Sequence, residues 1–206
     1  VFEQIDGKTS RHFNDLGTQQ VKNIDKPVHV YGDFARVMQK KEEEKRHRPL
    51  LDHVDDEKPP VTGGCLCGNI RYEIINPPID VGYCHCKMCQ RFTGAPMIAG
   101  STFAKDSVLF TKGKVKFYQS SPIAKRGFCD SCGSSMVYQP ISRRWTDWIF
   151  LFAGTLDNAD EFVPEWHLGV ESHVPWLKYN DELPKVRCED SPGIVEAYEE
   201  AEKFSE

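Results

Sequence analysis

The stretch YCHCKMCQRFTG, residues 83–94, places three cysteines within six positions: Cys84, Cys86 and Cys89. Thiolates this close together usually hold one metal ion, because a short turn brings them to the same point. A closed structural zinc site takes four protein ligands, whereas a site with three protein ligands leaves room for water or a substrate. The stretch therefore raises the question of what occupies the fourth position.

Two further pairs of cysteines lie before and after this stretch. They are Cys65 and Cys67 in GGCLCG, and Cys129 and Cys132 in FCDSCG. Glycines flank both pairs and permit the sharp turns that a chain needs to fold back on a metal. The two pairs together make a complete four-thiolate set. The simplest partition is therefore one closed structural zinc site and a second, open zinc site at the three-cysteine stretch.

Metal binding explains these cysteines better than disulfide bonds do. Their C-x-C and C-x-x-C spacings, in a chain without a visible signal peptide, are typical of metal sites in a reducing, cytoplasmic compartment. Zinc is the expected ion, because thiolate-rich sites select zinc or iron–sulfur clusters and none of the spacings is that of a ferredoxin. Two alternatives stay open: the pairs could combine differently, or Cys188 could close the second site.

The composition argues against two classes of binding partner, nucleic acids and membranes. The 206 residues include 26 basic and 31 acidic side chains, for a formal net charge of −5. This balance argues against a general nucleic-acid-binding protein, which usually has a basic excess. No apolar run approaches the ~20 residues of a membrane span, so no membrane partner is expected. Since the chain begins at Val1 rather than methionine, an upstream targeting segment is left open.

The sequence divides into four segments that differ in composition and residue pattern. Residues 1–34 contain the strand-like run VHVY, and residues 35–60 carry the charged run QKKEEEKRHR and a proline pair, which indicates a linker. Residues 61–190 are typical of a small all-β domain, with short strands between turn residues. Residues 191–206 predict a terminal helix with Pro192 at its first position.

Five runs of the central domain are predicted to be strands, because they are rich in β-branched and aromatic residues. They are NIRYEII (69–75), PMIAGSTF (96–103), KVKFYQ (114–119), SSMVYQ (134–139) and DWIFLFAG (147–154). No helical periodicity runs through this domain. The terminal helix, with Ser191 as its N-cap, is expected to pack on the domain through an apolar stripe. The stripe comprises Ile194, Ala197, Tyr198, Ala201 and Phe204.

The central domain resembles the glutathione-dependent formaldehyde-activating family, also called the CENP-V/GFA family. The resemblance covers residues 61–184 and rests on three cysteine runs in order: GGCLCGNIRYEI, YCHCKMCQRFTGAP and KRGFCDSCGSSMVY. The later segment GTLDNADEFVPEWHLGVESHVPWLKYNDELP is similar to the family's closing segment. Three cysteine runs in order, with matching glycines, make the resemblance specific.

This resemblance implies a mainly β, zinc-stabilised β-tent domain, here with an N-terminal extension and a C-terminal helix. It implies the same partition of the cysteines into a structural site and a site associated with activity. It also implies a reaction, the condensation of formaldehyde with glutathione to S-hydroxymethylglutathione, which is classed as carbon–sulfur lyase chemistry. A small thiol such as glutathione and an aldehyde are therefore the expected partners, although a fold transfers within a family better than a reaction does.

Residues 1–34 carry a second resemblance, to the last segment of class III adenylate/guanylate cyclase domains. It rests on a D-L-G, K-N-I and P-V-x-V-Y pattern. The metal-binding and nucleotide-contacting residues of that family lie upstream of this segment, so no cyclase activity is expected. A β-prone segment of this kind is expected to dock on the zinc domain or on a second copy of the chain, as in a homodimer, because an unpaired strand edge invites pairing.

The expected chemistry at an open zinc site is nucleophilic. A zinc-bound thiol is a thiolate at neutral pH, and an aldehyde carbon is its natural electrophile. His167 in the motif PEWH matches the family's histidine and is the expected proton-transfer residue, whereas His85, between two ligands, is expected to point away from the metal. Gln90 and Arg91 are candidate contacts for an anionic ligand. Four tryptophans could line a pocket but are more often core residues in a β domain: Trp145, Trp148, Trp166 and Trp176.

Three alternative functions are compatible with these residues. The first is a carbon–sulfur lyase that handles a glutathione–aldehyde adduct at the open zinc. The second is a binding module in which both zinc ions are structural, and its signature would be a fourth protein ligand at each ion. The third is a redox sensor whose thiolates release zinc on oxidation.

Overall fold

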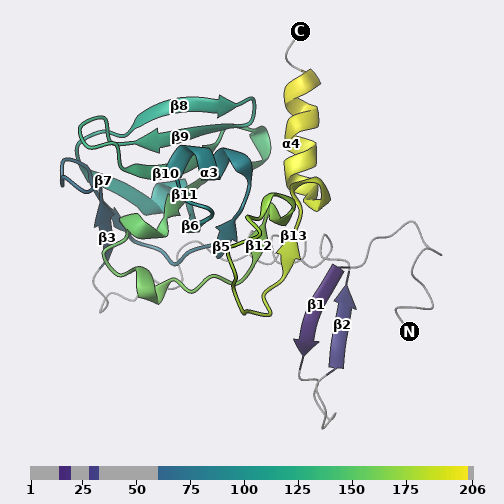
Figure 1. Cartoon of the computed structure of the whole chain (residues 1–206). Coiled ribbons are helices and arrows are strands. Elements are labelled where there is room, and N and C mark those ends of the chain that lie inside the picture. The colour runs from purple at the N-terminus through teal and green to yellow at the C-terminus, as the bar shows by residue number, and fades with distance from the viewer. Residues whose placement is uncertain (1–13, 20–27, 33–59, 204–206) are drawn as a thin grey trace.

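The structure is a computed structural model that describes residues 14–19, 28–32 and 60–203. Most of the described strands belong to one eight-stranded sheet and one three-stranded sheet, and a helix lies near the C-terminal end (Figure 1). The prediction of a mainly β fold with a C-terminal helix is confirmed. The predicted linker lies outside the described residues, except for Pro60.

The small sheet has the strand order β3-β4-β7, and all its pairs are antiparallel. Its strands are β3 (Val61–Gly64), β4 (Arg71–Ile74) and β7 (Val108–Lys112). Side chains on β4 alternate, so that Tyr72 and Ile74 are buried. The buried Tyr72 hydroxyl donates a hydrogen bond of 2.8 Å to the backbone oxygen of Thr155. This face of the small sheet therefore belongs to the core.

The large sheet has the strand order β13-β12-β5-β6-β11-β10-β9-β8. Its strands are β5 (Asp80–Cys84), β6 (Ile98–Ala104), β8 (Lys116–Ser121), β9 (Ala124–Phe128), β10 (Ser135–Pro140), β11 (Trp148–Phe152), β12 (His167–Leu168) and β13 (Lys185–Val186). The six strands from β5 to β8 pair in antiparallel fashion, whereas β12 pairs in parallel with both β5 and β13.

Alternation along β11 divides the two faces of the large sheet. Ile149 and Leu151 belong to the main core, which also contains Tyr72 and Ile74 of the small sheet, so this core lies between the two sheets. Residues of the opposite parity, such as Phe150, lie on the other face. That second face is the one that the helices and the candidate site use.

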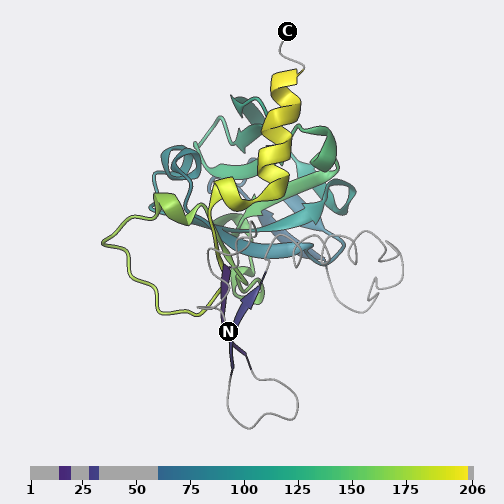
Figure 2. The same cartoon turned by 90° about the vertical axis from the view of Figure 1, so that its right-hand side faces the viewer.

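Two helices flank the second face of the large sheet. The helix α3 (Lys87–Thr93) was not predicted; Cys86 is its N-cap, and Gly94, with φ +72°, ends it. The helix α4 (Pro192–Lys203) was predicted, with Pro192 at its first position. Figures 1 and 2 show α4 standing along one side of the large sheet.

The apolar stripe of α4 packs on the domain as predicted. Ala197 is buried against Ile123 and Ala124, with Tyr198 and Ala201 beside it. The Ser191 carbonyl accepts hydrogen bonds from the backbone amides of Ile194 and Val195 in the first turn of the helix. Phe204, the last residue of the predicted stripe, lies outside the described residues. No helix in the described part of the chain is long and apolar enough to cross a membrane.

The N-terminal segment contributes a separate two-stranded sheet. It consists of β1 (Asn14–Gln19) and β2 (Val28–Gly32), paired antiparallel, and β2 confirms the strand predicted at VHVY. The resemblance of residues 1–34 to a cyclase segment stays a prediction, as do the domain boundaries at residues 61, 190 and 191.

The five predicted runs each contain a strand. These strands are β4, β6, β8, β10 and β11. The sequence did not predict the remaining strands of the two sheets, which include β5 and β9. Both matter for function, because β5 leads into the three-cysteine stretch and β9 carries a buried arginine.

Candidate functional site

The first thiol cluster joins the two sheets at one end. Cys65 and Cys67 lie in the turn between β3 and β4, and Cys129 and Cys132 lie in the turn between β9 and β10. The four sulfur atoms all lie within 4.8 Å of one another. Since one turn belongs to the small sheet and the other to the large sheet, a metal held here would clamp the sheets together.

The geometry of this cluster fits a tetrahedral ion. The Sγ atoms of Cys65 and Cys67 are 3.5 Å apart, and those of Cys67 and Cys129 are 3.9 Å apart. Zinc–sulfur bonds of about 2.3 Å in a tetrahedral site place the sulfurs roughly 3.8 Å apart. The turns depend on Gly68 and Gly133, whose φ angles of 70° and 75° favour glycine. The donor set and its spacing therefore fit zinc.

The second thiol cluster comes from one continuous turn. Cys84 is the last residue of β5, Cys86 is the N-cap of α3, and Cys89 lies in the first turn of that helix. Their sulfur atoms also lie within 4.8 Å of one another. Among the described residues, no fourth cysteine, histidine or carboxylate side chain lies that close to all three. The predicted grouping of the cysteines into four and three is thus what the structure brings together.

Hydrogen bonds set the charge within the second cluster. The thiols of Cys84 and Cys89 hydrogen-bond to Cys86 and lower its pKa to about 2, while the interaction with Cys86 raises the pKa of Cys84 well above its ordinary value. The backbone amide of Cys89 also donates to the Cys86 sulfur, at 3.4 Å. One thiolate is thus already favoured without a metal, and a dication would replace the protons on the other two thiols.

A buried arginine lies against this cluster. Arg126 on β9 is only 2% exposed, and its Nη2 donates to the Cys89 sulfur at 3.5 Å. Its guanidinium also lies over the Tyr138 ring, 5.3 Å from the centroid. Burial opposes its charge, but the hydrogen bond to Cys89 and the nearby thiols hold the pKa of Arg126 above its usual value. A permanent positive charge therefore faces the thiols.

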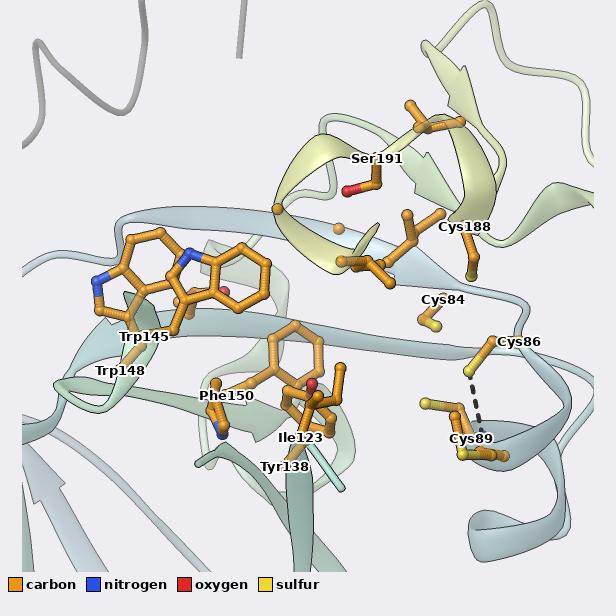
Figure 3. A pocket seen from close by; sticks show the side chains of 18 of the residues that line it. Cys84, Cys86, Cys89, Ile123, Tyr138, Trp145, Trp148, Phe150, Cys188 and Ser191 are labelled. Atoms are coloured by element: carbon orange, nitrogen blue, oxygen red, sulfur yellow. Dashed lines mark hydrogen bonds between the residues drawn. The ribbon is translucent and has the colours of Figure 1, made fainter. Parts of the chain in front are cut away.

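The second cluster opens onto a pocket of about 340 Å³ on the second face of the large sheet. Figure 3 shows the three thiols on one side of this pocket and the indoles of Trp145 and Trp148 on the other. Ile123, Tyr138 and Phe150 lie between them. The first turn of α4 forms a further wall, and the pocket lining is predominantly apolar.

The tryptophans differ from the prediction. Trp145, Trp148 and Trp166 line the pocket, although aromatic residues in a β domain were expected to be core more often than pocket. Trp148 faces the pocket because it lies on the parity of β11 opposite to the core residue Ile149. Trp176 is 72% exposed and lies outside this pocket.

The structure does not bring His167 into the pocket with the thiols. His167 is fully buried, whereas its neighbours Trp166 and Leu168 line the pocket. Its Nδ1 shares a hydrogen bond of 2.8 Å with Nε2 of His85, and its Nε2 lies 3.2 Å from the carboxylate oxygens of Asp181. His167 is thus linked to the cysteine turn through His85 rather than through the pocket.

The two histidines are held in the neutral form. Burial, followed by the charges of nearby histidines, lowers the pKa of His85 to about 4, and burial also lowers the pKa of His167. His85 is fully buried, does not line the pocket and is not part of the three-cysteine group. Gln90 donates to the backbone oxygens of His85 and Ser172, so it fixes the turn, and neither it nor Arg91 lines the pocket.

Several residues of the site were missed by sequence reasoning. They come from strands and loops that are distant in sequence from the three-cysteine stretch: Ile123, Arg126, Tyr138, Phe150 and Asp181. The available signal was the run AKRGF, in which two charged residues, Lys125 and Arg126, stand in a strand directly before a cysteine pair. A charged residue in such a strand indicates a buried partner or ligand.

The fold and the two cysteine clusters define a mainly β domain with one group of four thiols and one group of three that could each hold a metal ion. The chain belongs to the glutathione-dependent formaldehyde-activating enzyme family, whose model matches residues 60–172. The family resemblance given by the three cysteine runs is therefore confirmed, and the two-sheet arrangement agrees with a β-tent-like fold.

Two further proteins and one solved structure are similar to parts of this chain. A protein of Halomonas elongata that is provisionally named a glutathione-dependent formaldehyde-activating enzyme is 28% identical to this chain over 127 residues. The matched residues are 56% of this chain and 78% of that protein. An uncharacterized lyase of Schizosaccharomyces pombe is 34% identical over 80 residues, which are 39% of this chain and 58% of that protein. A crystal structure of a Rhodobacter sphaeroides protein matches with a TM-score of 0.38 and 26% identity, over 47% of this chain and 87% of that one.

Proposed function

We propose that the chain is a zinc-dependent enzyme of carbon–sulfur lyase type, which catalyses the reversible addition of a thiol to an aldehyde. The observation that carries this proposal is the incomplete ligand set: three thiols converge on a pocket, and no fourth ligand side chain in the described part of the chain joins them. The names of the family and of its Halomonas elongata relative support glutathione and formaldehyde as the first substrates to test.

Different residues of this chain would bind the metal ion and stabilise charge in the proposed reaction. Cys84, Cys86 and Cys89 would hold the ion, which when bound stabilises a thiolate or polarises a carbonyl. Arg126 offsets part of the negative charge of the thiols and lies where a developing oxygen anion would be stabilised. In the addition, a sulfur–carbon bond forms while the thiol S–H bond and the carbonyl π bond break. The thiol proton ends on the new hydroxyl group.

The first prediction concerns this reaction. Adding the zinc-loaded protein to glutathione and formaldehyde at neutral pH is expected to speed adduct formation and its reversal in proportion to protein concentration, without changing the equilibrium constant. Exchange spectroscopy with ¹³C-labelled formaldehyde measures both rates at equilibrium. An exchange rate that does not depend on protein, with glutathione and with uncharged thiols alike, would rule out the proposed reaction.

A second prediction concerns His167, which we propose acts as a positioning residue through His85. The substitution His167→Gln is expected to weaken metal binding at the three-cysteine site by about tenfold, the lower end of the effect of outer-shell partners. Metal binding at the four-cysteine site should be unchanged. Competition titration with a chromophoric chelator measures both affinities in one experiment.

Glu165→Gln, an exposed position in the same segment, serves as the matched control for His167. It is expected to leave both metal affinities as they are in the original chain. If His167→Gln lowers only the free energy of unfolding and leaves both affinities unchanged, His167 is a core residue without a role at the site.

A further inference from the structure

We propose that the pocket beside the three-cysteine site binds an apolar carbonyl compound, with an aromatic or branched alkyl group against the indole side and its oxygen toward Arg126. The proposal deepens the proposed function, on which it rests for the reaction of this compound. The binding preference itself can be measured without any reaction.

The size and lining of the pocket suit a larger and more apolar carbonyl compound than a one-carbon aldehyde. A cavity of about 340 Å³ falls within the range of roughly 300–1,000 Å³ that is typical of small-molecule sites. Formaldehyde would leave most of this space unfilled and would contact none of the far walls. Trp145, Trp148, Phe150 and Ile194 line these walls and offer contact to an apolar group.

The charges of the pocket do not match those of glutathione. Glutathione carries carboxylates at both ends and an ammonium group, and each would need a partner if buried. The pocket has two charged lining residues outside the thiols, Asp80 and Arg126. Asp80 already accepts a hydrogen bond of 2.9 Å from Thr102. Glutathione therefore fits this site only with its charged ends outside the apolar part, which leaves that part for the carbonyl partner.

Arg126 provides the polar end of this site. It is almost fully buried, and its two Nη groups donate to the sulfur of Cys89 and to the hydroxyl of Ser120. Its Nε–H has no hydrogen-bond partner in the described structure and has almost no accessible surface of its own, so a ligand oxygen reaches it only if the side chains that cover it shift. A buried donor without a partner is costly, so an acceptor that reaches it gains binding energy. A carbonyl oxygen next to the thiols is such an acceptor.

The experiment compares two ligands of the same shape. Acetophenone carries a carbonyl oxygen where α-methylstyrene carries a methylene group, and neither is an aldehyde. The metal-loaded chain is expected to bind both, with acetophenone about tenfold tighter, because a hydrogen bond to a charged donor is worth roughly that factor. Tryptophan fluorescence reports binding, since Trp145 and Trp148 lie in the pocket.

Substitutions at Arg126 and Ile194 test where the oxygen and the apolar group of the ligand lie in the pocket. Arg126→Met is expected to reduce the preference for acetophenone to about one; should it fail to fold, Arg126→Lys keeps a charge but lacks the Nε–H. Ile194→Glu places a carboxylate on the α4 wall and is expected to weaken the binding of both ligands at least tenfold. The matched control is Val195→Glu, the next residue of the same helix, which is exposed and lies outside the pocket lining.

The outcomes separate this inference from the proposed reaction. Binding of both ligands with the expected preference supports the inference even if no thiol addition is catalysed. Catalysis of the glutathione–formaldehyde reaction without binding of either aromatic ligand would overturn the inference and leave the reaction standing. A preference for acetophenone that survives in both Arg126 variants would overturn the role of Arg126, and equal losses in Ile194→Glu and Val195→Glu would overturn the location.

Discussion

Replacing Cys129 with serine is expected to lower the free energy of unfolding by more than about 3 kcal/mol, because a structural zinc contributes on the order of 10–16 kcal/mol of binding energy to folding in small zinc domains. Cys129 is fully buried, belongs to the main core and lies in the four-thiol cluster that joins the two sheets. Denaturant unfolding followed by circular dichroism, with metal analysis of the folded fraction, measures the effect.

The matched control for Cys129 is Asp130→Ser, an exposed position in the same turn. It is expected to keep its metal and to change the free energy of unfolding by less than about 0.5 kcal/mol. A strong chelator should destabilise the original chain as much as Cys129→Ser does. A Cys129→Ser variant with unchanged stability and unchanged metal content would contradict a structural role for this cluster.

The substitution Cys86→Ser is expected to reduce the protein-dependent rate of thiol addition to the solution background while the fold survives. The three-cysteine site loses a ligand, and two thiols hold zinc too weakly to retain it. Serine can still accept the hydrogen bond from the Cys89 amide that caps α3, so the helix is retained. The measurements are the exchange rate, the metal content, which should fall from two ions per chain to one, and the free energy of unfolding.

Cys188 provides the comparison that decides between an open and a closed second site. It lines the same pocket, and burial followed by the charge of Glu171 raises its pKa to about 12. If the second site is open, Cys188→Ser keeps two ions per chain, and the cobalt-substituted protein keeps its thiolate absorption. Loss of the second ion in this variant would favour the binding module, in which both ions are structural.

The two cysteine clusters that could hold metal ions were predictable because their signal is local. Each cysteine pair or triple lies within a few positions of sequence, next to glycines such as Gly68 and Gly133 that the turns require. Strands with clear alternation, such as β4 and β11, were predicted for the same reason: their period can be read within a few residues. The division into four and three thiols followed from counting ligands.

The pocket could not be predicted, because its residues are brought together only by the fold. Ile123, Arg126, Phe150 and Ile194 come from three separate parts of the chain and share a place only through the order of the strands and the docking of α4. The helix α3 was missed because its seven residues are too few for a helical period to show. His167 was placed by its motif, but its motif could not reveal that it faces Asp181 rather than the pocket.

The two thiol clusters constrain the unfolded chain very differently. Cys67 and Cys129 are 62 residues apart, so an ion that bridges them acts as a long-range cross-link, and a cross-link of this span removes about 4 kcal/mol of entropy from the unfolded ensemble by analogy with disulfides. The triple closes a ring of only a few residues and restricts that ensemble little. An ion at the three-cysteine cluster would therefore exchange in the native protein, whereas release of an ion from the four-cysteine cluster would be coupled to global unfolding.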